Sequence, residues 1–356
     1  MADDRVVKLA KLMVNYSLKL KKGDTVVINS GTEAEPLVLN LYEELLRKGC
    51  FPVVRMIPER VTEIFLKSAG RRQLTELTSY QRAAARYTDA VIRIYDETNT
   101  RQLSSVDPKR QAMWGRTIRP LQRERRKKPW LLTLYPTEAY AQDADMSLNE
   151  FEDFVYSAAF VDKADPVKEW QKLSKKQATL IAGMKGADKV RIVGRDTDLT
   201  FSVKGRKFMN SDGSSHNMPS GEIFTGPVEN SAEGHISYDF PVCQYGREIT
   251  GIRLVFRKGV VVEATADKNG SFLKSMLDTD KGSRKLGEFG IGTNHSIKRF
   301  TKRILYDEKI GGTIHLAVGE SYSETGGKNR SAIHWDMIKD LREEGAVYID
   351  GKKLKF

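Results

Sequence analysis

The first 135 residues alternate helix-like and strand-like patterns, and this order restricts the fold more than any other feature of the sequence. Strand-like runs rich in β-branched residues lie at 25–29, 52–56, 90–95 and 130–135. Helical patterns lie at 4–20, 35–48, 60–69 and 72–87, and another long helical segment precedes the last strand. Because strands that alternate with helices form parallel sheets covered on both faces, we predict an α/β N-terminal domain with a mainly parallel sheet.

The pattern of expected secondary structure changes after residue 185 to short strands separated by turns. Amphipathic helices at about 147–184 precede the change and are expected to bridge the two halves. Strand-like runs follow at 190–193, 199–203, 252–256, 260–264, 313–318 and 347–349. The pair Asp350-Gly351 is a hairpin turn signal. We therefore predict an α+β C-terminal domain with mainly antiparallel strands, and a division of the 356 residues into domains 1–185 and 186–356.

Several classes of protein are disfavoured by the composition. No stretch approaches the roughly 20 apolar residues that cross a bilayer, and the N-terminus MADDRVVKLAKLM carries acidic residues where a signal peptide has basic ones. Cys50 and Cys243 lie in unrelated contexts, so neither a disulfide framework nor a cysteine-bound zinc site is expected. These features predict a cytoplasmic protein with no membrane partner.

The chain is basic, with 59 Lys and Arg against 47 Asp and Glu and a net charge of +12. The densest basic run lies at 116–128, where helical spacing spreads the charges over several faces, so we interpret it as a solvated helix and loop. No RRM, KH or zinc-finger signature accompanies it, and nucleic acid is not an expected partner. No GxGxxG or GxxxxGK[ST] motif follows the first strand, so the N-terminal half is interpreted as a scaffold and partner surface.

Candidate metal ligands gather in the second half. They occur at four places: Glu222 in NMPSGE, Glu288 in GEFG, His315 in IHL, and the pair His334 and Asp336 in IHWD. In an extended segment, side chains two residues apart point to the same face, so His334 and Asp336 could reach one ion. Two imidazoles and three carboxylates suit zinc, cobalt or manganese, and three carboxylates with one hydroxide balance two divalent ions. Each residue alone has an ordinary structural explanation, and the sequence does not show whether they converge.

Several segments resemble, in the same order, the thermophilic aminopeptidase family of metallopeptidases, the group of aminopeptidases T, S and II. In the second half they are NMPSGEIFTGPVENSAEG (217–234), LGEFGIGTN (286–294), IHLAVGESY (314–322) and NRSAIHWDMI (329–338). In the first half they are LAKLMVNYSLKLKKGDTVVI, PLVLNLYEELLRKGCFPVVR, NTRQLSSVDPKR and MSLNEFEDFVYSA. The similarity runs nearly from end to end.

The resemblance implies a homodimeric metalloaminopeptidase that removes the N-terminal residue from peptides with a free N-terminus. It implies two divalent metal ions (Zn, Co, Mn or Mg) in a C-terminal metallopeptidase domain. Carried over residue by residue, the ligands fall on Glu222, Glu288, His315, His334 and Asp336, and a catalytic tyrosine falls on Tyr322. A tyrosine hydroxyl there would donate a hydrogen bond to the developing oxyanion.

Three points stay open at this stage. Either Glu222 or Glu288 could be the general base, but a metal-bound carboxylate is a weakened base, so the role is not assigned. The resemblance gives His216, His235 and His295 no ligand role, and they are supporting or structural candidates. The alternative functions are a two-metal phosphoesterase, which uses the same ligand types, and a non-enzymatic basic nucleic-acid-binding protein.

Overall fold

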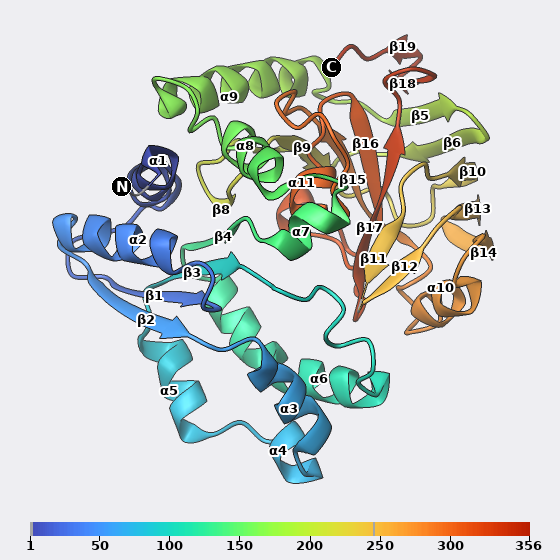
Figure 1. Cartoon of the computed structure of the whole chain (residues 1–356). Coiled ribbons are helices and arrows are strands. Elements are labelled where there is room, and N and C mark those ends of the chain that lie inside the picture. Colours follow the sequence, from blue (N-terminus) through green and yellow to red (C-terminus); the bar gives the residue numbers. More distant parts are fainter. Residues whose placement is uncertain (1–2, 245) are drawn as a thin grey trace. The chain divides into compact units, whose positions relative to one another are not determined.

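The computed structural model describes residues 3–244 and 246–356 (Figure 1). It divides into two compact units, one of Met1–Lys168 with Gly213–Pro219 and the other of Glu169–Asp212 with Ser220–Phe356. The chain thus returns briefly to the first unit after entering the second. The division at 185/186 stays a prediction.

The first unit is a five-stranded sheet with helices, as the alternating pattern predicts. Its strands are β1 (Thr25–Ser30), β2 (Phe51–Met56), β3 (Ala90–Tyr95), β4 (Trp130–Leu134) and β8 (His216–Asn217). All neighbours pair in parallel, in the order β2-β1-β3-β4-β8. The helices are α1 (Asp4–Leu12), the π-helix η1 (Met13–Ser17), α2 (Glu35–Arg47), α3 (Arg60–Ser68), α4 (Arg71–Thr75), α5 (Ser79–Tyr87), α6 (Pro108–Arg126), α7 (Glu138–Asp143) and α8 (Leu148–Ala158). The predicted mainly parallel sheet is confirmed.

Local signals explain where several of these helices begin. Ser147 starts α8 with a capping box, in which its hydroxyl accepts from the Glu150 amide while the Glu150 carboxylate accepts from the Ser147 amide. Thr78 and Gln81 do the same for α5. The expected helix at 72–87 is two helices, α4 and α5, because this second cap starts a new helix after Thr75.

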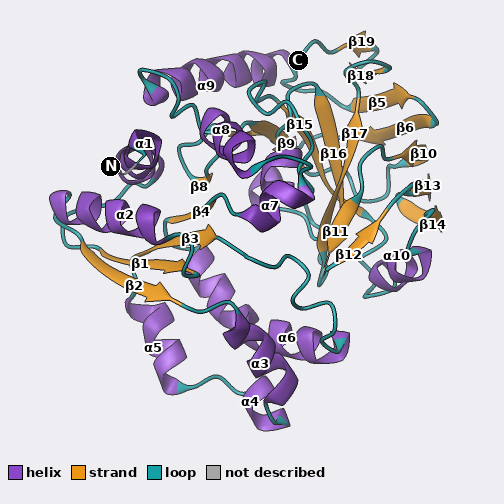
Figure 2. Cartoon of the chain, in the orientation of Figure 1, coloured by secondary structure: helices purple, strands orange, loops and turns teal. Residues whose placement is uncertain are grey.

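The second unit is built from antiparallel sheets with few helices (Figure 2). A seven-stranded sheet has the order β14-β13-β10-β6-β5-β18-β19, a five-stranded sheet the order β17-β16-β15-β9-β7, and β11 pairs with β12. The helices are α9 (Pro166–Gly183), α10 (Gly270–Leu277), α11 (Ile304–Asp307) and the 3₁₀ turn η2 (Ser323–Thr325). The strands are β5 (Lys189–Gly194), β6 (Thr197–Ser202), β7 (Met209–Ser211), β9 (Glu222–Thr225), β10 (Glu233–Ser237), β11 (Val242–Gln244), β12 (Arg247–Ile249), β13 (Arg253–Arg257), β14 (Val260–Thr265), β15 (Leu286–Gly292), β16 (Thr313–Gly319), β17 (His334–Asp340), β18 (Gly345–Ile349) and β19 (Lys352–Lys353). The predicted antiparallel α+β domain is confirmed.

An apolar core joins the two larger sheets of this unit. Phe201 of β6 meets Phe289 of β15 edge to face, with ring centroids 5.3 Å apart. Both side chains are fully buried. The hairpin predicted at Asp350-Gly351 is present, with φ of 48° and 80°, and the Asp350 carboxylate accepts from the Lys189 amide at 2.7 Å. The core described above covers one face of the five-stranded antiparallel sheet of this unit, and the opposite face is free for other side chains.

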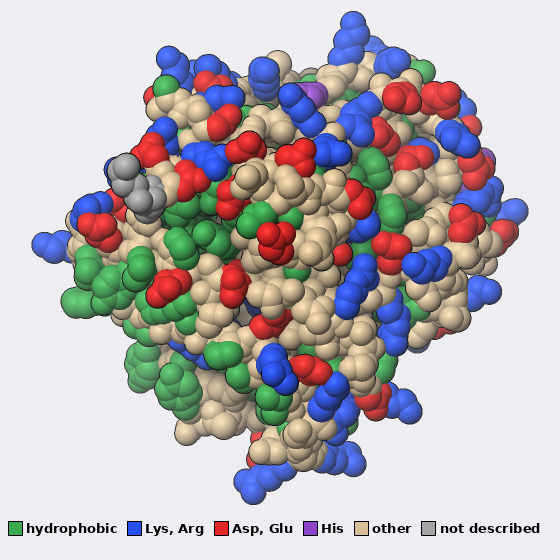
Figure 3. Space-filling view, viewed as in Figure 1, with side chains coloured by type: hydrophobic (Ala, Val, Ile, Leu, Met, Phe, Trp, Pro, Cys, Tyr) green, Lys and Arg blue, Asp and Glu red, His purple; other side chains and the backbone are tan. Residues whose placement is uncertain are grey.

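Charges of both signs are mixed on the surface. On the face drawn in Figure 3, Lys and Arg side chains are interspersed with Asp and Glu rather than gathered into one stripe. Among the described residues, no helix is both long enough and apolar enough to cross a membrane.

Candidate metal centre

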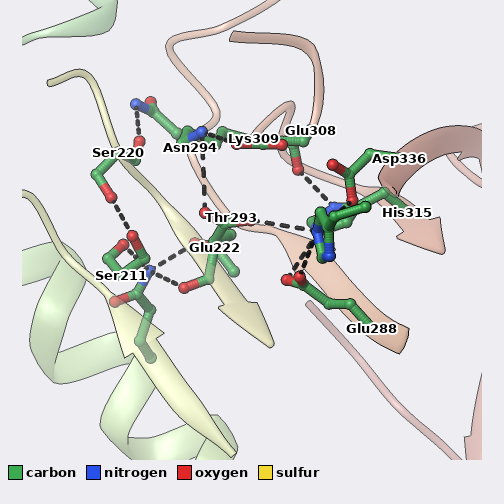
Figure 4. A network of polar contacts seen from close by, with 12 residues as sticks. Ser211, Ser220, Glu222, Glu288, Thr293, Asn294, Glu308, Lys309, His315 and Asp336 are labelled. Carbon is green, nitrogen blue, oxygen red and sulfur yellow. Dashed lines mark hydrogen bonds and ion pairs between the residues drawn. The ribbon is translucent and has the colours of Figure 1, made fainter. Parts of the chain in front are cut away.

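One face of the five-stranded antiparallel sheet carries all five candidate ligands. Figure 4 labels four of them, Glu222, Glu288, His315 and Asp336. Strand register places Glu222 opposite Gly292, His315 opposite Gly290, Asp336 opposite Ala317 and His334 opposite Gly319. Side chains of paired residues lie on the same face, and every second residue of a strand shares that face. The intervening residues, such as Phe289, Leu316 and Trp335, point into the apolar core. Period-two alternation therefore separates ligands from core on every strand.

The ligand atoms form two groups that share one residue. Glu222, Glu288 and His315 make one group, and Glu288, His334 and Asp336 make the other, with the donor atoms of each group within 4.8 Å of one another. His315 Nε2 lies 3.3 Å from Glu222 Oε2 and 3.5 Å from Glu288 Oε1. His334 Nε2 lies 3.1 Å from the other Glu288 oxygen and 3.5 Å from Asp336 Oδ1. Glu288 thus directs one oxygen to each group.

A glycine makes room for the first of these imidazoles. A Cβ atom at Gly290 would lie 2.0 Å from both Cε1 and Nε2 of His315. No side chain fits there while the ring keeps its place. The second glycine in GEFG is therefore a steric requirement of the cluster.

Backbone carbonyls orient both rings. His315 Nδ1 lies 3.0 Å from the Glu308 carbonyl oxygen, and His334 Nδ1 lies 2.7 Å from the Glu320 carbonyl oxygen. A carbonyl can only accept, so each Nδ1 carries the proton and donates it. Each Nε2 is then directed at the carboxylates, which is how ligating histidines are held in metalloproteins.

Protonated imidazoles supply the positive charge of the cluster. Burial opposes the charged form of His315, but its hydrogen bond to Glu288 and the nearby carboxylates outweigh burial and raise its pKa to about 10. Burial likewise opposes ionisation of Asp336, yet the charge of His334 lowers its pKa to about 2. Burial raises the pKa of Glu222 to about 8 despite the nearby Lys309. Metal binding at such residues is therefore coupled to the release of their protons.

The residues present fit a divalent cation. Oδ1 of Asp336 is buried and accepts no hydrogen bond from the residues that the structure describes, although His334 is near. A buried carboxylate oxygen with no hydrogen bond is an atom that a cation can bind. Two imidazole nitrogens and three carboxylates are also the donor set that zinc, cobalt and manganese accept.

Two buried residues beside the cluster were missed by sequence reasoning. Lys309 is fully buried, pairs with Glu308, and lies 3.8 Å from Glu222 Oε1. The charges of Lys309 and Glu308 compensate each other, so this pair adds no net charge beside the ligands. The sequence has one other adjacent Glu and Lys, Lys168-Glu169, and only burial distinguishes the pair at 308–309 from it.

A buried amide supports the backbone at Glu222. The side-chain nitrogen of Gln177, on α9, donates to the carbonyl oxygens of Ser211 and Glu222 at 3.1 Å each and to Thr293 Oγ1 at 2.9 Å. Gln177 is fully buried. The sequence analysis expected this helix to bridge the two halves and gave Gln177 no role. Its only hint was one glutamine on the apolar side of an amphipathic helix.

Further contacts hold the turn before β9. Asn294 Nδ2 donates to the Ser220 carbonyl oxygen at 3.0 Å, and the Gly221 amide donates to the Ser211 carbonyl oxygen at 2.9 Å. Gly221 has φ +123°, and a Cβ there would lie 2.5 Å from the Asn294 Cβ. Glycine is therefore required at this position for two independent reasons.

Tyr322 lies at the edge of the cluster, directly before η2. Its ring centroid is 5.1 Å from the His334 ring and 5.5 Å from the Phe224 ring, and the side chain is 39 % exposed. The charge of His334 lowers the pKa of the phenol, but burial and the carboxylates of Glu288 and Asp336 outweigh it and raise the pKa. Its hydroxyl is thus protonated at neutral pH and can donate a hydrogen bond.

The remaining histidines lie outside the two ligand groups found among the described residues. His216 is in β8 of the first unit, against the Trp130 ring. His235 lies 3.6 Å from Asp196, and burial lowers the pKa of His295. The structure therefore brings together the five candidate ligands and Tyr322 and leaves these three histidines apart.

Comparison with known proteins places this cluster in a family context. Aminopeptidase 2 of Geobacillus stearothermophilus is 27 % identical, over 97 % of this chain and 94 % of that protein. Aminopeptidase T of Thermus thermophilus is 25 % identical, over 97 % of this chain and 95 % of that protein. The solved structure of wild-type AmpT from Thermus thermophilus has the same fold, with a TM-score of 0.82 over 99 % of this chain and 97 % of that one at 22 % identity. The model of the thermophilic metalloprotease family (M29) matches residues 2–355, and the chain belongs to that family.

Proposed function

We propose that this chain is a metal-dependent aminopeptidase that hydrolyses the N-terminal residue from peptides at a dinuclear divalent-metal site. The observation that carries the proposal is Glu288, whose two oxygens belong to two adjacent ligand groups. Two cations held by these groups would be neighbours, as two-metal hydrolysis requires. The relatives' names as aminopeptidases support the reaction class.

The proposed ligands are Glu222 and His315 for one cation, His334 and Asp336 for the other, and Glu288 for both. Divalent cations there would supply Lewis acidity to the scissile carbonyl and an activated water. Zinc, cobalt, manganese and magnesium are the candidates. The two backbone carbonyls that fix the imidazole rings, and the buried Gln177 amide, keep the donors in place before substrate arrives.

Tyr322 is the proposed catalytic residue outside the ligand set. Its ring lies beside the His334 ring, and its protonated hydroxyl would donate to the oxyanion that develops on the scissile carbonyl. The substrate's free α-amino group is proposed to contact a carboxylate of the cluster, which would restrict cleavage to the first residue. Peptides with a free N-terminus are therefore the proposed substrates.

Amino-acid release from paired peptides tests this function. Chelator-treated protein is given short peptides with free or acetylated N-termini, with and without added zinc or cobalt. We expect metal-restored release from the free peptides only. Equal cleavage of acetylated peptides would contradict recognition of the amine, and hydrolysis of phosphoesters without any amino-acid release would favour the phosphoesterase alternative.

The assembly and location are proposed from the sequence alone. A homodimer is implied by the sequence resemblance, and sedimentation of the purified chain measures it. The cytoplasmic location rests on the composition and stays a prediction.

A further inference from the structure

A hollow of about 710 Å³ in the first unit is lined by residues of the parallel sheet and of the helices α5 and α6. Both helices lie below the sheet in the view of Figure 1. Strands β1 to β4 all contribute to its walls. A smaller hollow adjoins it and shares Asn29, Arg55, Tyr80 and Arg125 with it. Every residue in the two walls belongs to the first unit, so this space is separate from the metal centre.

Four arginines line this space, and three of them, Arg55, Arg93 and Arg125, are close enough to influence one another. Arg55 of β2 and Arg93 of β3 are both in register with Asn29 of β1, so all three side chains lie on the same face of the sheet. Neighbouring strands are about 4.8 Å apart, which places the two arginine Cα atoms roughly 10 Å from each other with Asn29 between them. Arg125 approaches from α6. Burial is the main cause that lowers the pKa of the Arg125 guanidinium, and the positive charges of Arg55 and Arg93 lower it further.

These guanidinium groups have no anionic partner within the described part of the chain. None of Arg55, Arg93 and Arg125 forms an ion pair with a carboxylate there, and only Arg93 has a ring contact, with its guanidinium 4.9 Å from the Tyr95 centroid. Three like charges around a half-buried space repel each other unless an anion joins them. The basic run interpreted from the sequence as a solvated helix thus contributes two arginines to the wall, the half-buried Arg125 and the exposed Arg126.

The carboxylates that line the same hollow are engaged elsewhere. Asp96 accepts from the Gly31 amide at 2.7 Å and the Ala34 amide at 2.9 Å. Glu59 accepts from the backbone amides of residues 98 and 99. Glu97, the third carboxylate of the wall, also has its own interactions. Among the described residues, none of these carboxylates forms an ion pair with Arg55, Arg93 or Arg125.

Asp96 also explains why the usual nucleotide position of such a sheet is closed. In the strand order β2-β1-β3-β4, ligands bind beyond the carboxyl ends of β1 and β3, where the order reverses. Here the Asp96 carboxylate already accepts the hydrogen bond of the Gly31 amide after β1. A Cβ at Gly31 would lie 2.6 Å from the Asp96 Oδ1. An anion must therefore find its donors on the side chains of the sheet face rather than on the backbone turn.

We propose that Arg55, Arg93 and Arg125 bind the phosphate group of a small molecule in this hollow. Guanidinium groups match phosphate oxygens in pairs, and three of them exceed the charge of a phosphate dianion. Tyr80, 69 % exposed on the same wall, offers a ring face to any planar group attached to that phosphate. The shared chemistry is a phosphate, carried by a nucleotide or free in solution.

Calorimetric titration of the full chain tests the proposal in a buffer without phosphate. The probes are adenosine 5′-monophosphate, inorganic phosphate and adenosine. We expect saturable binding of the two phosphate-bearing probes and none of adenosine. Tighter binding of the monophosphate than of phosphate supports a nucleotide as the source, and equal binding supports free phosphate. Adenosine binding as tightly as its monophosphate, or no binding of either phosphate probe, overturns the proposal.

Variants separate this hollow from the metal centre, which can also attract phosphate. Arg125→Gln, Arg55→Gln and Arg93→Gln should each weaken binding about tenfold to a hundredfold, the scale of a charge-assisted hydrogen bond. Arg123→Gln is the matched control, because Arg123 lies on the same helix outside both walls. Circular dichroism confirms folding of each variant. Unchanged affinity in every wall variant that folds overturns the proposal, even if only one of the three folds.

Discussion

The two sheets differ in what their polar faces carry. The five-stranded antiparallel sheet presents carboxylates and imidazoles beside glycines, all buried or nearly so. The parallel sheet presents arginines beside Asn29 over an open hollow. The same period-two alternation therefore builds a cation site or an anion site, depending on which charged residues occupy the polar face.

The largest effect should come from removing a proposed ligand. Asp336→Ala should lower kcat/KM by more than about a thousandfold, because a metal contributes several kcal/mol of transition-state stabilisation. Metal content, measured by elemental analysis, should fall with it. Glu343→Gln, which removes an exposed carboxylate after the end of β17, is the control and should leave both unchanged. Full metal loading with normal activity in Asp336→Ala would rule out the ligand set.

Tyr322→Phe should lower kcat by about 10² to 10³ while metal content stays normal, because only the oxyanion donor is lost. This variant separates catalysis from metal binding within the same face. Tyr348→Phe, on β18 of the other sheet, is the matched loss of a phenol hydroxyl and should keep wild-type kcat. An unchanged kcat in Tyr322→Phe would remove the tyrosine from the mechanism.

Gly290→Ala tests the steric requirement at the sheet face that carries the proposed metal ligands. The new Cβ would overlap the His315 ring, and overpacking of this kind costs about 1–3 kcal/mol. We expect metal affinity to fall about tenfold or more, measured by competition with a chelator. Gly270→Ala is the control, since a Cβ there meets nothing within 4 Å. Equal metal affinity in the two variants would show that His315 moves freely.

Gln177→Leu removes the buried amide that supports the backbone of Glu222. Three acceptors lose their donor, and an unsatisfied buried polar group costs about 1–3 kcal/mol. Denaturant unfolding should show this loss in the free energy of unfolding. Thr179→Ala on the same helix, whose hydroxyl bonds to its own helix backbone, is the control. A stability loss of the same size in both variants would argue against a special role for Gln177.

The smallest effect concerns acid stability near the loop that leads to β17. Burial opposes ionisation of Asp280, but hydrogen bonds from Ala332, Ser331, Gly282 and Ser283 outweigh it and hold its pKa below the usual value of 3.8. A lowered folded pKa stabilises the protein above the unfolded value and loses that contribution as pH falls through the folded one. Asp280→Asn should therefore destabilise the protein at pH 6, and the difference from wild type should shrink below about pH 4. A difference that is independent of pH would contradict this account.

Much of this protein is determined by its sequence. The strand and helix periods predicted both sheet types, and β3 has the bounds expected from the sequence. The HxD spacing predicted that His334 and Asp336 share a face, and β17 confirms it because the segment is extended. The roles of the ligands and of Tyr322 stay proposals, whereas the structure places these side chains close together.

Only the tertiary structure decided which distant residues meet. The glycine-rich β15 has almost none of the β-branched residues that mark strands, and its pairing with β9 and β16 forms it. Gln177, Glu308 and Lys309 are ordinary polar residues in sequence, and their burial beside the ligands depends on packing. The arginine hollow likewise depends on the register of β1, β2 and β3. Sequence periodicity fixes which face a side chain takes within its own strand, whereas contacts between strands far apart in sequence depend on how the strands pair.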